Sequence, residues 1–437
     1  MTGTLIVGGG QAGAQAAFSL REMGYTADIT IVGSEPHLPY QRPPLSKAFL
    51  AGTADHETLQ FRKPAYYDKI RVEVLCNQRV TDIEFDGGTA DAAGTAQLHD
   101  GTEKSFHHLM LAVGGRPRRL TVPGSDLTGV CYLRTIADAV QLISHLEHGA
   151  SVVVIGGGFV GLEAAAMARG RGKTVTVVEL AERLLSRTVA PEMSAFLTEA
   201  HQRRGTHIRL GDGVTAIEGN DGQATGVRLS DGSLLPADVV IVGVGMTPRL
   251  ELAERLGLET AGGIVVDSFA RTSDSRVVAA GDCTVGPNPM TGSGFVRLES
   301  VQNAVDQAKV AAASIAGQPF THSALPWFWS NQGDLKLQMA GLTEGYDHVE
   351  LRGEPAAEKF SAFYYRDGRL LAVHAVNRPQ DYMLARKALS QRMTIPPDRV
   401  ADGAAASWLF PDIGVHPRTG ADRCGRPQCL AESSRQA

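Results

Sequence analysis

The sequence predicts an α/β fold with two βαβ units of the same design, followed by a smaller α+β region. The first unit, residues 4–32, reads TLIV, GGGQAG, an alanine-rich helix and DITIV. Residues 151–179 repeat that order as SVVVI, GGGFVG, LEAAAMARGRG and TVTVVE. From about Phe320 onward, alternating aromatic and apolar residues favour an antiparallel sheet that closes with a helix.

Length and composition are those of a globular chain with several domains. The 437 residues exceed one typical core and predict two or three domains. A formal net charge of −5 gives no electrostatic reason to expect nucleic acid or an anionic membrane as a partner. The longest apolar runs fall far below the roughly 20 residues that span a bilayer, and no export signal is recognisable. With five scattered cysteines, these features predict free thiols and a cytoplasmic location.

The first glycine turn has the pattern of a dinucleotide site. In Gly8-x-Gly10-x-x-Gly13 the first glycine permits a tight turn, the second lets a pyrophosphate approach, and the third lets helix and strand pack closely. The following helix directs its N-terminus at the phosphates. Glu35, at the end of the next strand, is placed to accept hydrogen bonds from ribose hydroxyls. The alternative is a glycine-rich turn beside a surface glutamate, which the strand and helix context disfavours.

The second turn, Gly156-x-Gly158-x-x-Gly161, predicts a second dinucleotide. Glu179 ends the next strand, where a carboxylate binds the 2'-hydroxyl of NADH and repels the 2'-phosphate of NADPH. The sequence therefore predicts NADH. Because Arg183 and Arg187 lie close by, partial accommodation of a phosphate stays open.

The order of further motifs resembles the oxygenase-coupled NADH-ferredoxin reductases, relatives of putidaredoxin and rubredoxin reductase. The motifs are YQRPPLSK (40–47), GGGFVGLE (156–163), GVGMTPR, AAGDC, RLESVQNA and PWFWSNQG, and the resemblance covers about residues 3–402. It implies the glutathione reductase fold, with two Rossmann-like domains of which the FAD domain is discontinuous. The implied segments are an FAD-binding domain at 1–110 and 240–319, an inserted NADH-binding domain at 111–239, a C-terminal α+β interface domain at 320–402, and an extended or disordered tail at 403–437.

The resemblance also implies catalytic roles for three residues. Lys47 would lie beside flavin N5 and pair with Glu163, because a lysine there stabilises negative charge that develops on the ring. Taken alone, they would be a surface lysine and a helix-dipole glutamate. Trp329 resembles the tryptophan beside the flavin where an iron-sulfur partner docks, and its alternative role is that of a core aromatic.

The other implied positions are cofactor contacts. Asp282 in AAGDC would accept the ribityl hydroxyl, and the helix from Val301 would direct its dipole at flavin N1. No metal site is predicted. For FAD the positions are Gly8, Gly10, Gln11, Ala12, Gly13, Glu35, Arg42, Lys47, Val80, Ala112, Arg134, Asp282, Glu299, Ser300, Val301 and Trp329. For NADH they are Gly156, Gly158, Phe159, Val160, Gly161, Glu163, Glu179, Arg187 and Gly245.

Cysteine is missing where disulfide reductases of this fold carry a redox pair, since residues 40–50 contain none. We therefore expect hydride transfer from NADH to FAD, followed by two single-electron transfers to a [2Fe-2S] ferredoxin. That ferredoxin would feed a Rieske oxygenase or a cytochrome P450. Two alternatives stay open: an NADH-dependent quinone or other small-molecule reductase, and a signalling protein like apoptosis-inducing factor. The sequence leaves monomer and homodimer open.

Overall fold

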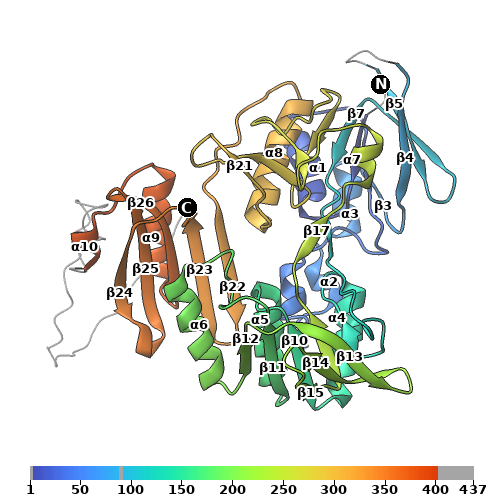
Figure 1. Ribbon diagram of the computed structural model, residues 1–437. Helices are drawn as coiled ribbons and strands as arrows, with labels where there is room; N and C mark the ends of the chain where they lie inside the picture. The colour runs from blue at the N-terminus through green and yellow to red at the C-terminus, as the bar shows by residue number, and fades with distance from the viewer. Residues whose placement is uncertain (1–2, 88–91, 402–437) are drawn as a thin grey trace, which may run out of the picture.

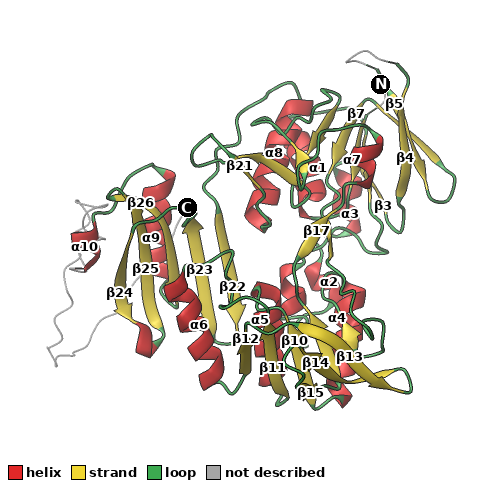
Figure 2. Cartoon of the chain, in the orientation of Figure 1, coloured by secondary structure: helices red, strands yellow, loops and turns green. Residues whose placement is uncertain are grey.

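The computed structural model describes residues 3–87 and 92–401, so the predicted tail at 403–437 lies outside the described residues. The described chain forms three groups of elements, two of them centred on parallel sheets and one on an antiparallel sheet (Figure 1). Figure 2 shows that the helices of the first two groups lie against their sheets. The predicted α/β class with two Rossmann-like units and an α+β region is confirmed.

The first group surrounds a parallel sheet of order β19-β7-β1-β2-β3. Its central strands are almost wholly apolar, as expected for a sheet covered on both faces. The alanine-rich helices α1 and α8 pack on one face and the β4-β5-β6 sheet on the other. Its elements are β1 (Thr4–Val7), α1 (Gln11–Glu22), β2 (Ile29–Val32), η1 (Pro43–Ser46), α2 (His56–Leu59), α3 (Pro64–Lys69), β3 (Val72–Leu75), β4 (Val80–Phe85), β5 (Gly94–Leu98), β6 (Glu103–Phe106), β7 (His108–Leu111), α7 (Glu251–Arg255), β18 (Ile264–Val265), β19 (Val277–Ala279), β20 (Thr284–Pro287), β21 (Phe295–Val296) and α8 (Val301–Ile315).

The second group surrounds a parallel sheet of order β12-β11-β10-β16-β9, beside a small antiparallel sheet of β13, β14 and β15. The core strand β10 and helix α5 reproduce the strand, glycine turn and helix of the first group. Its elements are β9 (Val130–Cys131), α4 (Ile136–His148), β10 (Ser151–Ile155), α5 (Phe159–Gly170), β11 (Thr174–Glu179), α6 (Pro191–Arg203), β12 (His207–Leu210), β13 (Val214–Asn220), β14 (Gln223–Leu229), β15 (Leu234–Pro236) and β16 (Val239–Val242).

Two short strands carry the chain out of the first group and back. β8 (Gly115–Pro117) pairs antiparallel with β17 (Met246–Pro248). The sequence assigned residues 240–242 to the first domain, but β16 pairs with β10 and β9 in the second sheet. We therefore propose the β8–β17 pair as the boundary between the first and second groups.

The third group is an antiparallel sheet of order β22-β23-β26-β25-β24. One face packs on α9, and residues of the other, such as Leu337 and Phe360, join the core of α5 and α6. In Figure 1, α6 accordingly lies between the second sheet and the third. The elements are β22 (Trp327–Gln332), β23 (Leu335–Gly341), β24 (His348–Glu354), η2 (Pro355–Ala357), β25 (Lys359–Arg366), β26 (Arg369–Val376), α9 (Pro379–Ser390) and α10 (Pro397–Ala401).

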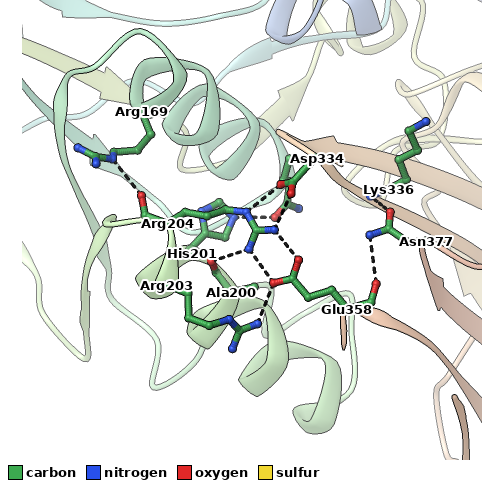
Figure 3. A network of polar contacts seen from close by, with 10 residues as sticks. Arg169, Ala200, His201, Arg203, Arg204, Asp334, Lys336, Glu358 and Asn377 are labelled. Atoms are coloured by element: carbon green, nitrogen blue, oxygen red, sulfur yellow. Dashed lines mark hydrogen bonds and ion pairs between the residues drawn. The ribbon is translucent and has the colours of Figure 1, made fainter. Parts of the chain in front are cut away.

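An ion-pair cluster joins the end of α6 to the third sheet (Figure 3). Arg204 donates to Asp334 from Nε and Nη2 at 2.8 and 2.9 Å, and to Glu358 from Nη1 and Nη2 at 2.8 and 2.5 Å. Arg203 contacts the same Glu358 at 2.9 Å. The hydrogen bonds from Arg204 lower the pKa of Glu358 to about 2. The cluster ties the second group to the third at the carboxyl end of a helix, where cations are favoured.

Candidate nucleotide and electron-transfer sites

The first glycine turn is a backbone cradle. Gly8 has φ +129, and a Cβ there would lie 2.1 Å from the Ala112 carbonyl oxygen. A Cβ on Gly13 would lie 2.0 Å from the Gly8 carbonyl oxygen, so neither position accepts a side chain. At Gly10, the N-cap of α1, a Cβ would have no neighbour within 4 Å. Gly8 and Gly13 pack closely against backbone, whereas the space at Gly10 is open. An anion therefore has room to meet the first turn of α1, which begins with Gln11.

A chain of charged groups lies beside this turn. The Glu35 carboxylate accepts hydrogen bonds from Arg42 Nη2 and from the Tyr40 hydroxyl, each at 2.5 Å. Arg42 also donates to the Arg134 carbonyl oxygen at 2.8 Å. Arg134 in turn forms an ion pair with Asp282 at 3.3 Å. The structure thus brings together four predicted FAD contacts from segments that lie far apart in the sequence.

Further predicted FAD positions lie at the ends of strands and helices. Val80 begins β4 and is buried. Ala112 directly follows β7 and packs in the same hydrophobic cluster as Ala12. Ser300 caps α8 by accepting a hydrogen bond from the Asn303 N–H at 3.0 Å. The exposed Glu299 precedes it and forms an ion pair with Arg297.

A cavity of about 240 Å³ opens between the first group and β22. Lys47 and Trp329 both line it, although 282 positions separate them in the sequence. Val301, at the start of α8, forms another part of its wall. The residues around it are Gln11, Gln41, Pro43, Pro44, Lys47, Ala48, Val301, Trp329 and Asn331. A planar group that extends from the first glycine turn would meet an ammonium, a helix N-terminus and an indole here.

Glu163 stands behind Lys47. Its carboxylate on α5 is 3% exposed and lies 2.6 Å from Lys47 Nζ. The Ser46 hydroxyl donates to the same Oε2 atom, and the Ser330 hydroxyl donates to Oε1 at 2.7 Å. A buried ion pair is stable only when further hydrogen bonds offset the loss of water, and the two serines supply them. The lysine is therefore fixed at the cavity wall by a carboxylate from the second group.

The second glycine turn has the same construction as the first. Gly156 has φ +104, and a Cβ on Gly161 would lie 2.3 Å from the Gly156 carbonyl oxygen. Gly158 is the N-cap of α5. The two oxygens of Glu179 accept hydrogen bonds from backbone N–H groups, of Gly157 at 2.7 Å and of Ala181 at 2.8 Å. The predicted ribose-binding carboxylate is thus fixed directly at the turn.

The other predicted NADH positions surround this turn. Phe159 packs its ring 4.6 Å from that of Phe328 on β22, whereas its neighbour Val160 is 44% exposed. Arg187 reaches to 3.5 Å from the place of a Cβ on Gly245, which has φ +101. Arg187 thus lies near Gly245, another predicted NADH position.

None of the described cysteines lines the cavity. Burial raises the pKa of Cys131 to about 12 and that of Cys283 to about 11, and it also raises the pKa of Cys76. All three are free, as predicted, whereas Cys424 and Cys429 lie outside the described residues. None of the described cysteines is an activated thiolate.

Sequence reasoning missed the residues behind Lys47 and Glu163. Ser330 and Gln332 occupy inward positions of a strand otherwise rich in aromatic residues, and both are 1% exposed or less. Two polar residues at i and i+2 on a buried strand face were the available signal. Ser46, directly before Lys47, was the other.

Two nucleotide turns, each followed by an acid-tipped strand, together with a C-terminal sheet, define the class of two-dinucleotide oxidoreductases. A family model described as pyridine nucleotide-disulphide oxidoreductase matches residues 2–308, and one described as reductase C-terminal matches residues 327–406. The chain belongs to the pyridine nucleotide-disulphide oxidoreductase family.

Similar proteins narrow that class. Rhodocoxin reductase of Rhodococcus erythropolis is 46% identical over 91% of this chain and 92% of its own. Putidaredoxin reductase of Pseudomonas putida is 40% identical over 91% and 94%. The ferredoxin reductase for the CYP199A2 system from Rhodopseudomonas palustris superposes with a TM-score of 0.88 at 42% identity, over 92% of this chain and 98% of that one. The covalent putidaredoxin reductase–putidaredoxin complex gives 0.88 at 38%, over 94% and 99%. The family predicted from the motif order is confirmed.

Proposed function

We propose that the chain is an NADH-dependent, FAD-containing reductase that passes single electrons to a [2Fe-2S] ferredoxin of an oxygenase system. One observation carries the proposal: Lys47 and Trp329 line the same cavity between the first nucleotide turn and the C-terminal sheet. The names of the similar proteins, rhodocoxin reductase and putidaredoxin reductase among them, support a ferredoxin as the acceptor. The Rieske or P450 identity of the oxygenase belongs to the same proposal.

The residues present fit FAD. Gly8 and Gly13 exclude side chains from the cradle, Gly10 leaves it open, and the cavity continues from Gln11 to Trp329. The chemistry that FAD supplies when bound is acceptance of a hydride from NADH and release of electrons one at a time. The chain contributes binding, orientation and charge. The ammonium of Lys47 favours electron density at the cavity wall, and the N-terminus of α8 at Val301 does so from another side.

Glu179 and Arg187 are proposed to bind the NADH. The carboxylate of Glu179 is already oriented by two backbone N–H groups, so it presents a fixed acceptor to a ribose hydroxyl. Exposed Val160, at the start of α5, provides an apolar contact beside it.

Trp329 and Trp327 are proposed to lie on the electron exit path. Their ring centroids are 5.6 Å apart, and the guanidinium of Arg386 lies 4.6 Å from the Trp327 ring. Arg378, the N-cap of the helix α9 that carries Arg386, is paired with Asp381 at 2.6 Å, which offsets its charge. Arg386 is thus the better candidate for steering an acidic ferredoxin toward the aromatic pair.

The test is an anaerobic assay of NADH oxidation with a panel of [2Fe-2S] ferredoxins and with quinones as acceptors. The proposal predicts that at least one ferredoxin is reduced faster than every quinone. A quinone that outpaces all ferredoxins would make the protein a small-molecule reductase, and an NADH-driven change of oligomeric state without acceptor turnover would favour the signalling reading.

Location and assembly complete the proposal. No helix in residues 3–87 and 92–401 has the length and apolar character needed to cross a membrane. We propose a cytoplasmic protein that works as a monomer or homodimer.

A further inference from the structure

A buried chain of neutral polar groups continues from Glu163 away from Lys47. The Ser330 hydroxyl donates to Glu163 Oε1 at 2.7 Å, and Gln332 Nε2 donates to Ser330 Oγ at 3.2 Å. His201 Nε2 lies 2.8 Å from Gln332 Oε1. Ser330 is 0% exposed, and Gln332 and His201 are each 1% exposed. Residues without contact with water thus link the Lys47–Glu163 pair to α6.

The hydrogen bonds of this chain run in one direction. Because Gln332 Oε1 can only accept, His201 Nε2 must carry the hydrogen between them. Burial lowers the pKa of His201, which favours the uncharged ring. The donors then run from His201 to Gln332, to Ser330 and to the carboxylate of Glu163. Aligned donors polarise one another, and here each of them points toward the Glu163 carboxylate.

Few charges face this chain. Among the described residues, Lys47 at the end of η1 is the cation against the Glu163 carboxylate, while Ser46 and Ser330 are neutral. At the far end, the charge of Arg204 also lowers the pKa of His201. Figure 3 shows Arg204 beside His201, at the ion-pair cluster with Asp334. The chain therefore runs from the cavity wall to the contact between α6 and the third sheet.

We propose that Ser330 and Gln332 are positioning residues for the reduction by NADH. They hold the Glu163 carboxylate in the orientation that places Lys47 at the cavity. The inference rests on the proposed function for its kinetic part, whereas the coupling of Ser330 to Glu163 follows from the geometry alone. The two faces of β22 then have different roles. Trp329 and Asn331 line the cavity, and Ser330 and Gln332 hold its lysine through Glu163.

The first experiment measures that coupling in the flavin-loaded protein without turnover. Ser330→Ala, Glu163→Gln and the double variant are unfolded in urea at a fixed excess of FAD. We expect the double variant to lose less than the sum of the single losses, because both changes break the same hydrogen bond. The matched control is Ser361→Ala, another buried serine of this sheet, which bonds to Asp381 at 3.0 Å and should add to Glu163→Gln. Additive losses for Ser330→Ala would overturn the proposal.

The second experiment follows flavin bleaching by NADH in single turnover. Ser330→Ala should slow it about tenfold at pH 7, since Glu163 loses a donor that fixes its orientation. Ser330→Thr, which keeps the hydroxyl, should recover most of the rate, and Ser361→Ala should keep the rate of the unmodified protein.

The outcomes separate the two proposals. An unchanged rate in Ser330→Ala, with normal bleaching of the unmodified protein, overturns the positioning role alone. Absence of bleaching in the unmodified protein overturns the proposed function and, with it, the kinetic part of this inference.

Discussion

Lys47 is held at the cavity because a residue 116 positions later, Glu163, lies behind it. An ammonium that contacts a buried carboxylate at 2.6 Å keeps one orientation, whereas a free lysine samples many rotamers. The Lys47 side chain is only 18% exposed, so its charge acts on the cavity with little screening by water.

Replacement of Lys47 by methionine keeps its length and removes its charge. We expect flavin reduction by NADH to slow about 100-fold, the usual cost of losing one preorganised electrostatic group. Stopped-flow absorbance measures the rate. The control is Lys104→Met. Lys104 also forms an ion pair, with Glu73 at 2.9 Å, but this pair lies on the surface of the first group. Equal rates in the two variants would remove Lys47 from the proposed role.

Replacement of Glu179 by alanine should narrow the preference for NADH over NADPH. The carboxylate at the glycine turn repels a 2'-phosphate, and Arg187 remains to receive it. The measurement is the ratio of kcat/KM for the two nucleotides, which we expect to fall about tenfold. Glu199→Ala, an exposed change on α6, is the control. A ratio unchanged from that of the control would contradict the assignment.

At the scale of elements, the glycine patterns predict both βαβ units and the residues of their turns. The sequence could not assign β16, because a buried VVIV strand suits either parallel sheet equally well. It also did not reveal Ser330, Gln332 or His201. The spacing of Ser330 and Gln332 could mark a polar strand face, but their partners lie on elements that meet only in the folded chain.

The link between α6 and the third sheet should depend on pH through Glu358. Its pKa is lowered to about 2, so its stabilisation is present above its ordinary value of 4.5 and is lost as pH falls from there toward 2. Glu358→Gln should cost about 1–2 kcal/mol of unfolding free energy at pH 7, discounted for partial exposure. The difference in unfolding free energy between the unmodified protein and Glu358→Gln should shrink between pH 4.5 and 3.

Urea unfolding of Glu358→Gln and of the unmodified protein at several pH values measures this loss of unfolding free energy. The control is Glu218→Gln, whose carboxylate pairs with Arg228 at 2.7 Å within a single hairpin and lies 41% exposed. A Glu358→Gln loss no larger than that of the control, or independent of pH, would show that the cluster contributes nothing specific.

At the scale of the molecule, the three groups divide the task. The first group forms most of the cavity, the second supplies Glu163, and the third contributes Trp329. In the proposed function the second group also presents NADH. The family resemblance carried by the sequence motifs predicted a division of this kind. The contacts across the groups came from the structure, since no local pattern encodes which helix lies against which sheet.

Reversal of charge at Arg386 should weaken the encounter with an acidic ferredoxin. We expect Arg386→Glu to raise the KM for ferredoxin severalfold and to leave flavin bleaching by NADH unchanged, because the residue lies on α9 against Trp327. The difference should fade at high salt as screening increases. Arg369→Glu, at the start of β26, is the control, and an equal rise in KM there would indicate a general charge effect.

The central claim is that electrons enter from NADH and leave directly to an iron-sulfur protein, without a thiol. Its most direct test is sequential anaerobic stopped-flow mixing of protein with alkylated thiols, first with NADH and then with an oxidised [2Fe-2S] ferredoxin. The account predicts that the flavin bleaches and that the ferredoxin then reoxidises it in one-electron steps, at the rates of the untreated protein. Loss of either step after alkylation of an otherwise folded protein would contradict it.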